Sequence, residues 1–253
     1  MFHSIPLRQK MKLSLNKNQQ IAKLKHSYLN NGFVKLESAL SNDTASLIYA
    51  NIAKQEQWNL VFRNNGIHQD LNNLAVERWD DKEKNNLTEL VHTQAVNAFQ
   101  YFYETIPIYD IYYDKLMPKH FFNDIVKFLN SEETLNFFRE ILEAPEITFL
   151  DAQITRFKAG HFLNRHNDNV KGKNRVAAFV INLSKNWRTD WGGALHILNN
   201  DLEIEQSFVP SFNEINIFKV PVEHLVGYVS PFATGHRLSI TGWLRSGDNP
   251  KKL

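Results

Sequence analysis

The side chains best suited to chemistry gather in the last third of the chain, beginning with His166 and Asp168. These two stand two residues apart, and on an extended chain residues i and i+2 point to the same side. The pair therefore directs an imidazole and a carboxylate toward one point, in a polar segment that suggests the mouth of a fold. Alone, such a pair is a weak signal, because most occurrences are ordinary surface residues.

His224 adds a third group of this kind, ahead of another β-rich run. Two imidazoles and one carboxylate on one face of a metal ion leave three coordination positions open, as is typical of non-haem iron(II) sites. By itself, His224 would be interpreted as a structural histidine near a strand end, with its ring nitrogens hydrogen-bonded within the protein. The arginine-containing segment that follows it favours the metal interpretation.

That segment, RLSITGWL, contains Arg237. Period-2 alternation puts Ser239, Thr241 and Trp243 on the same strand face as this arginine. A guanidinium is costly to bury without a partner, and a carboxylate ligand would provide one through two parallel hydrogen bonds. Ser239 would add a hydroxyl contact to the same carboxylate. The competing interpretation is a strand-edge arginine whose charge reaches solvent.

Composition narrows the remaining choices. The 253 residues include no cysteine, which excludes disulfides, zinc–thiolate sites, iron–sulfur clusters and cysteine nucleophiles. The 29 basic and 27 acidic residues offer no electrostatic case for nucleic acid or a membrane as the main partner. No apolar run has the length of a signal peptide or of a membrane span, so a cytoplasmic location is expected. Ser239 lacks a base and an acid at triad spacing, which disfavours a hydrolase.

The elements that position these residues fall into two halves. Short β-rich runs alternate with turns after Pro145, a pattern typical of a sandwich or barrel. We therefore expect an α+β fold in one domain, residues 1–253, with a mainly helical part (17–144) supporting a β-barrel core (145–246) that holds the site. Helices are expected near 17–31, 43–55, 88–103, 119–129 and 132–143, a strand at 33–40, and a loop-rich stretch at 63–86.

Four segments carry a resemblance to a known family: DAQITRFKAGHFLNRHND, RVAAFVINLSKNW, WGGALHIL and VPVEHLVGYVSPFATGHRLSITGWL. They resemble the 2-oxoglutarate/Fe(II)-dependent dioxygenase superfamily, specifically its prolyl-4-hydroxylase-like branch of bacterial and fungal proline hydroxylase-like proteins. The resemblance implies a double-stranded β-helix (jelly-roll) barrel with buttressing N-terminal helices. It implies Fe(2+) held by His166, Asp168 and His224, and no catalytic residue beyond these metal ligands. It further implies that Arg237, helped by Ser239, binds the distal carboxylate of 2-oxoglutarate, with O2 as the second co-substrate and ascorbate as an optional accessory.

The sequence departs from these relatives at two positions. The relatives often carry Tyr where this chain has Phe157, so only ring packing against the co-substrate remains there. Some animal prolyl hydroxylases have a Tyr at the position aligned with Ile181, and its absence makes the co-substrate carboxylate more dependent on Arg237 and Ser239. The spacing from His224 to Arg237 is also longer than in those animal enzymes, and the extra SPFATGH is expected to form a loop.

The function that the resemblance implies is hydroxylation of a prolyl residue in a protein, with proteins of translation among the candidate partners, and with release of succinate and CO2. Two alternatives stay open: hydroxylation of a free amino acid or another small molecule, and, from another class, a cupin-like barrel that binds a metal or ligand without turnover. Arg237 favours the enzyme, because a barrel that only binds metal has no need of a buried guanidinium. His161 and His196 lie near the site in sequence, and His196 is a further candidate for contact with the substrate.

Overall fold

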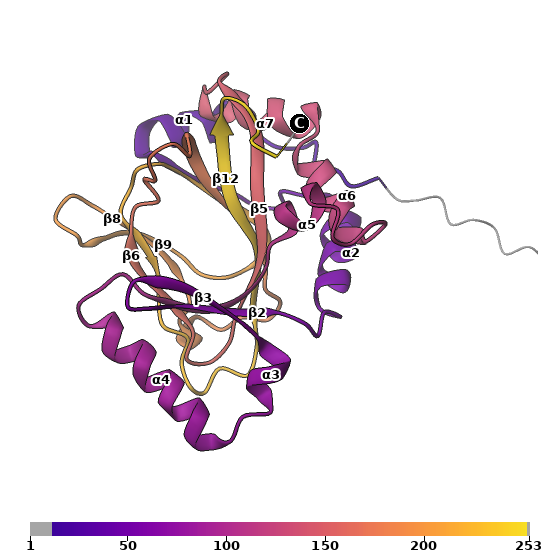
Figure 1. Ribbon diagram of the computed structural model, residues 1–253. Helices are drawn as coiled ribbons and strands as arrows, with labels where there is room; N and C mark the ends of the chain where they lie inside the picture. Colours follow the sequence, from indigo (N-terminus) through magenta and orange to yellow (C-terminus); the bar gives the residue numbers. More distant parts are fainter. Residues whose placement is uncertain (1–11, 252–253) are drawn as a thin grey trace, which may run out of the picture.

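The computed structural model describes residues 12–251 and is built around one curled antiparallel sheet (Figure 1). Its twelve strands are β1 (Phe33–Leu36), β2 (Asn59–Asn64), β3 (Ile67–Asn72), β4 (Tyr101–Ile106), β5 (Ile147–Phe157), β6 (Phe162–His166), β7 (Arg175–Leu183), β8 (Leu195–Leu198), β9 (Ile204–Phe208), β10 (Phe212–Lys219), β11 (His224–Val226) and β12 (Arg237–Ser246). They pair in the order β1-β10-β7-β12-β5-β4-β6-β11-β8-β9, and the β2–β3 hairpin joins the sheet through β4. This arrangement is the expected double-stranded β-helix with buttressing helices.

The helices form two groups around the sheet (Figure 1). One group comprises α1 (Ile21–Asn31), α2 (Asn42–Ile52), α5 (Ile108–Tyr113), α6 (Phe121–Leu129) and α7 (Glu132–Leu142). The other comprises α3 (Asn73–Glu77) and α4 (Asp81–Ala95), next to the β2–β3 hairpin. Within residues 12–251, no helix combines the length and the apolar character that a bilayer crossing requires.

Local capping chemistry explains where several of these helices begin and end. Gly32 ends α1 in the left-handed conformation, with φ of 74°, which glycine adopts without steric cost. The Ser41 side chain accepts a hydrogen bond from the Thr44 backbone N–H at the start of α2. Ser131 caps α7 in the same way. The predicted helices near 17–31, 43–55, 119–129 and 132–143 are therefore all present with slightly shorter bounds.

The central strand β7 is covered on both faces, which explains its nearly continuous apolar sequence RVAAFVINL. Phe179 and Ile181 belong to the large hydrophobic cluster shared with the helices. Ala178 and Val180 point the other way, into a smaller cluster inside the curled sheet. Successive residues of β7 thus alternate between two roles: one set packs against the helices, and the other set lines the concave side of the sheet.

The prediction of loops at 63–86 and of a helix at 88–103 was wrong. Residues 59–72 form the β2–β3 hairpin, whose two-residue turn Asn65-Gly66 has φ values of 50° and 78°. Positive φ at both turn positions is typical of the tight hairpin turn that Asn-Gly favours. The helix starts earlier, at Asp81, where Asp80 and Glu83 form a capping box. Tyr101–Ile106 is then strand β4 rather than the end of that helix.

Candidate metal centre and its cavity

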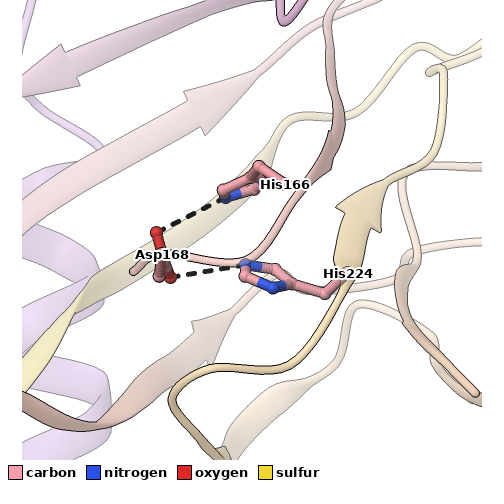
Figure 2. Close-up of side chains that lie close together, drawn as sticks. All are labelled: His166, Asp168 and His224. Atoms are coloured by element: carbon pink, nitrogen blue, oxygen red, sulfur yellow. Dashed lines mark ion pairs between the residues drawn. The ribbon is translucent and has the colours of Figure 1, made fainter. Parts of the chain in front are cut away.

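The sheet brings His166, Asp168 and His224 together from two neighbouring strands (Figure 2). His166 is the last residue of β6, and His224 is the first residue of β11, directly opposite it in the antiparallel ladder. Their ring centres lie 4.1 Å apart. Asp168 follows β6 with φ of 61°, a left-handed conformation that Asp tolerates better than most residues.

The three side chains converge on a common point. Asp168 Oδ1 lies 3.5 Å from His166 Nε2, and Oδ2 lies 3.4 Å from His224 Nε2 (Figure 2). The candidate ligand atoms all lie within 4.8 Å of one another. Each histidine Nδ1 donates a hydrogen bond to a backbone carbonyl, of Asn164 or Val222, at 2.9 Å. These bonds leave the Nε2 lone pairs facing Asp168, as metal ligation by neutral imidazole requires.

The ionisation of the cluster also suits a divalent cation. Burial lowers the pKa of His166 to about 4, and neighbouring His224 adds to this effect. The pKa of Asp168 is about 2, because contacts with His224, His166 and the Trp243 indole outweigh the opposing effect of burial. At neutral pH the site therefore presents an unprotonated imidazole at His166 and a carboxylate at Asp168, the forms that bind metals.

Asp168 is held in place by a second pair of residues. Arg175, at the start of β7, donates from Nη1 to the Asp168 backbone carbonyl at 2.9 Å and lies 3.6 Å from its carboxylate. The Arg175 guanidinium packs 3.5 Å from the Trp243 ring centre on β12. Sequence reasoning did not single out Arg175, because it begins a β-rich run without any neighbouring metal-ligand pattern and reaches Asp168 only through the fold.

These groups line one cavity of about 520 Å³. Arg237, Ser239, Thr241 and Trp243 all face it, which confirms the strand face predicted from alternation. The opposite wall comes from β6, β8 and β11. The insertion SPFATGH forms a loop between β11 and β12, as expected.

Arg237 is buried in this cavity without an anionic partner. Its exposed fraction is 3%, and burial lowers its pKa to about 10. Among the described residues no carboxylate pairs with it, and its Nε atom has no hydrogen-bond partner. The guanidinium carbon lies 4.9 Å from the centre of the Phe157 ring. An unpaired buried guanidinium in a cavity shared with the His-Asp-His cluster fits a carboxylate ligand such as 2-oxoglutarate.

Ser239 and Phe157 lie beside Arg237, where the sequence predicted them. Ser239 is fully buried, and its hydroxyl is 2.8 Å from the Thr155 hydroxyl on β5. Phe157 lines the cavity and stacks on Tyr103, with ring centres 4.9 Å apart. Tyr103, from β4, thus places a phenol hydroxyl close to Phe157, the position at which the relatives often carry a tyrosine. Burial raises the pKa of Tyr103 to about 12.

The N-terminal half contributes more to this cavity than predicted. Arg63 from β2 and Tyr101 and Tyr103 from β4 line it, so that the site extends beyond residues 145–246. The alternation in YFYETI was the available signal: Tyr101 and Tyr103 face the cavity, whereas Phe102 packs toward α4.

Other residues considered from the sequence lie outside the cavity. Ile181 belongs to the cluster under the helices, so a tyrosine at that position would not reach the site, whereas Val180 does. His161 is buried against Phe102, with ring centres 4.9 Å apart. His196 pairs with the Ser207 hydroxyl at 2.7 Å. None of these three side chains lines the cavity.

Comparison with known proteins agrees with this geometry. Residues 152–245 match the family described as the 2OG-Fe(II) oxygenase superfamily. The mouse (Mus musculus) protein prolyl 3-hydroxylase OGFOD1 is 34% identical over 101 residues, which are 37% of this chain. The match spans only 18% of that relative's length.

Solved structures share the fold. A prolyl-4-hydroxylase from Pseudomonas putida is 16% identical, with 90% of this chain and 100% of that chain covered and a TM-score of 0.60. A prolyl hydroxylase from Trichoplax adhaerens, solved with a peptide fragment of the hypoxia inducible factor oxygen degradation domain, is 14% identical, with 90% and 94% covered and a TM-score of 0.54. At these identities the likeness is one of fold.

Similarity to this superfamily implies Fe(2+), 2-oxoglutarate and O2 as cofactor and co-substrates. The His-Asp-His cluster fits a divalent cation, and the unpaired Arg237 fits a carboxylate co-substrate. Residues 152–245 of this chain thus resemble the 2OG-Fe(II) oxygenase superfamily, and the mouse relative that matches part of the chain is named a prolyl 3-hydroxylase.

Proposed function

We propose that this protein is an Fe(II)- and 2-oxoglutarate-dependent dioxygenase that hydroxylates a prolyl residue in a protein, with release of succinate and CO2. The observation that supports it most is the pairing of two features in one cavity. His166, Asp168 and His224 offer three metal ligands, and Arg237 offers a buried, unpaired guanidinium. A barrel that only held a metal would have no reason to retain that costly charge.

In this proposal each residue has a defined task. His166, Asp168 and His224 would hold iron on one face and leave three positions for 2-oxoglutarate and O2. Iron with these co-substrates supplies the oxidising power to hydroxylate an unactivated C–H bond. Arg237 would bind the distal carboxylate of 2-oxoglutarate through two charge-assisted hydrogen bonds, and Ser239 would add a hydroxyl contact. Phe157 would pack against the co-substrate and, with Tyr103, limit access of water from that side.

The prolyl substrate is supported by the relatives rather than by the cavity itself. The mouse relative is named a prolyl 3-hydroxylase, and the Trichoplax adhaerens structure contains a peptide. We therefore propose a protein partner, and proteins of translation are the first group to screen. A cytoplasmic location and a single domain over residues 1–253 remain predictions. A free amino acid or another small molecule is the alternative substrate.

The test incubates purified protein with Fe(II), 2-oxoglutarate, ascorbate and a cell lysate, and searches peptides and metabolites by mass spectrometry for one added oxygen. We expect succinate formation and a hydroxylated prolyl peptide. Oxygen added only to a free amino acid would support the small-molecule alternative. Iron binding without any succinate, with or without lysate, would support the non-catalytic barrel. The matched control is His224→Ala, which removes one predicted iron ligand.

A further inference from the structure

The mouth of the cavity carries a cation that the proposed reaction does not use. Arg63 lies near the end of β2, is half-buried and lines the same cavity as the metal cluster. The ion pairs that residues 12–251 form within this fold use other arginines, such as Arg156 with Glu104 and Arg245 with Asp151. Arg63 donates instead to the backbone carbonyl of Gly66 in the hairpin turn. Its charge is therefore available to a ligand.

The backbone of Arg63 is fixed by a buried amide. The Gln100 side chain, 1% exposed, accepts from the Arg63 backbone N–H at 2.7 Å and donates to the Arg63 carbonyl at 2.8 Å. The Gln100 backbone N–H in turn donates to Asn164 Oδ1 at 2.9 Å, which connects it to β6. The position from which the guanidinium projects is thus tied to the strand that carries His166. The guanidinium itself is oriented by its hydrogen bond to the Gly66 carbonyl, and an oriented donor loses less entropy on binding an anion.

Aromatic rings connect Arg63 to the metal cluster. The guanidinium carbon lies 5.6 Å from the Phe99 ring centre, and Phe99 lies 5.1 Å from the ring of His166. Arg63 and His68 are directly opposite on the β2–β3 hairpin, and His68 Nδ1 is 2.6 Å from the Tyr101 hydroxyl. The Phe99 ring therefore lies between Arg63 and a predicted iron ligand, and both of these residues face the same cavity.

The charge of the cavity points to an anion. Its lining contains three guanidinium groups, from Arg63, Arg175 and Arg237, but only one carboxylate, from Asp168. A ferrous ion and a 2-oxoglutarate dianion together add no net charge. Arg175 lies against Asp168, and Arg237 is the partner proposed for 2-oxoglutarate. Arg63 then remains as the cation without a counter-charge.

We propose that Arg63 binds a carboxylate of the substrate, located beside the carbon that is hydroxylated. This inference rests on the proposed function and narrows its substrate class to molecules with an acidic group next to the target. The carboxylate belongs either to an acidic residue flanking a proline in a peptide or to a free amino acid. Both sources present the same planar group, which a guanidinium binds through two parallel hydrogen bonds.

The test uses matched probes that differ only in charge. They are two blocked peptides, acetyl-Glu-Pro-Ala-amide and acetyl-Ala-Pro-Glu-amide, their Gln counterparts, and the pair L-proline and L-prolinamide. Calorimetric titrations under anaerobic conditions use the full chain with Mn(II) and 2-oxoglutarate, and are repeated without them. Wild type is compared with Arg63→Gln, Arg63→Lys and Lys171→Gln. Lys171 is exposed in the loop between β6 and β7 and does not line the cavity. Its variant therefore removes one positive charge near the cavity but leaves every lining residue unchanged.

In the wild type, one carboxylate probe is expected to bind roughly 10-fold to 100-fold more tightly than its amide twin. Arg63→Gln should abolish this preference, Arg63→Lys should retain part of it, and Lys171→Gln should keep it. Preference within a peptide pair identifies an acidic flanking residue, and preference for proline over prolinamide identifies a free amino acid. Equal binding within every pair, no binding of any probe, or a preference that persists in Arg63→Gln would overturn the proposal.

The same titrations separate this inference from the proposed function. A wild type that binds neither Mn(II) nor 2-oxoglutarate contradicts the dioxygenase proposal, whereas the probe preference is still measured without them. Loss of 2-oxoglutarate binding in Arg63→Gln would instead assign Arg63 to the co-substrate and overturn the substrate role. A thermal melt of each variant checks that it is folded. The Gln100 side chain bonds only to the main chain of Arg63, so these substitutions do not remove either partner of those hydrogen bonds.

Discussion

Arg237 and Phe157 stand directly opposite each other on β12 and β5, with the guanidinium carbon 4.9 Å from the ring centre. The ring face offers the buried cation a weak electrostatic partner. Because no carboxylate of the described residues completes the pair, the cation remains poorly compensated until an anion enters the cavity. The arrangement links ligand binding and stability at one residue.

Replacing Arg237 with Met should separate those two properties. Loss of the charge-assisted pair is expected to weaken 2-oxoglutarate binding by about 2–5 kcal/mol. The unliganded protein should be as stable as the wild type or more stable, because an uncompensated buried charge is removed. Anaerobic calorimetry and thermal melts measure the two effects, and iron content should not change. Unaltered 2-oxoglutarate affinity would contradict the assignment of Arg237.

Phe157→Leu should destabilise the protein by removing one ring of the Tyr103 stack. The lost aromatic pair is expected to cost about 0.5–1.5 kcal/mol of unfolding free energy, measured by urea denaturation. Phe157→Tyr keeps the ring and serves as the matched control, which the fold should tolerate. If both variants unfold at the wild-type midpoint, Phe157 contributes no packing at this wall.

His224→Ala should remove most of the bound iron and of the succinate formation, because it deletes one of three predicted ligands; His166→Ala and Asp168→Ala should do the same. Metal analysis after loading with Fe(II) measures the loss. His196→Ala is the control, since His196 bonds to Ser207 outside the cavity, and it should keep full iron. Full iron in His224→Ala would rule out the triad.

Arg175→Gln tests whether the support of Asp168 matters for the metal. The variant loses the guanidinium that holds both the Asp168 carbonyl and its carboxylate, but it keeps all three ligands. Residues that orient ligands typically change metal affinity roughly 10-fold to 100-fold, and we expect a loss in that range. Competition with a chelator gives the iron affinity. An affinity equal to that of the wild type would show that Asp168 is held without Arg175.

His161 should make stability depend on pH below neutrality. Burial lowers its pKa from 6.5 to about 4 in the folded protein, so the fold favours the neutral ring. The resulting stabilisation is complete above pH 6.5, falls as pH decreases, and is lost below about 4. Its full size is on the order of 3 kcal/mol.

The measurement compares the wild type with His161→Phe, which keeps a ring against Phe102 but does not titrate. Urea unfolding at pH 7 and at pH 4.5 should show a larger loss of stability in the wild type than in the variant. Parallel losses would mean that another group causes the acid sensitivity.

The sequence by itself determined which candidate ligand residues stand close together in the chain and which strand face they occupy. Side-chain alternation on an extended chain has a fixed period, so RLSITGWL was enough to place Arg237, Ser239 and Trp243 on one side. The order His166, Asp168, His224 and Arg237 likewise predicted a metal cluster and an anion site within one β-rich region. The predicted helix ranges 17–31 and 43–55 also contain most of α1 and α2, whose ends lie at the local capping residues Gly32 and Ser41.

The tertiary structure alone decided which distant segments complete the cavity. Arg63, Tyr101 and Tyr103 reach it because β4 pairs with β5 and β6, and β2 pairs with β4, so that segments far apart in the chain lie side by side. Such pairings depend on how whole strands fit against one another, and no local pattern specifies the partner. The same is true of Arg175, whose contact with Asp168 exists only after the loop between β6 and β7 has folded back. Local periodicity sets where a side chain points, whereas long-range packing sets what it meets there.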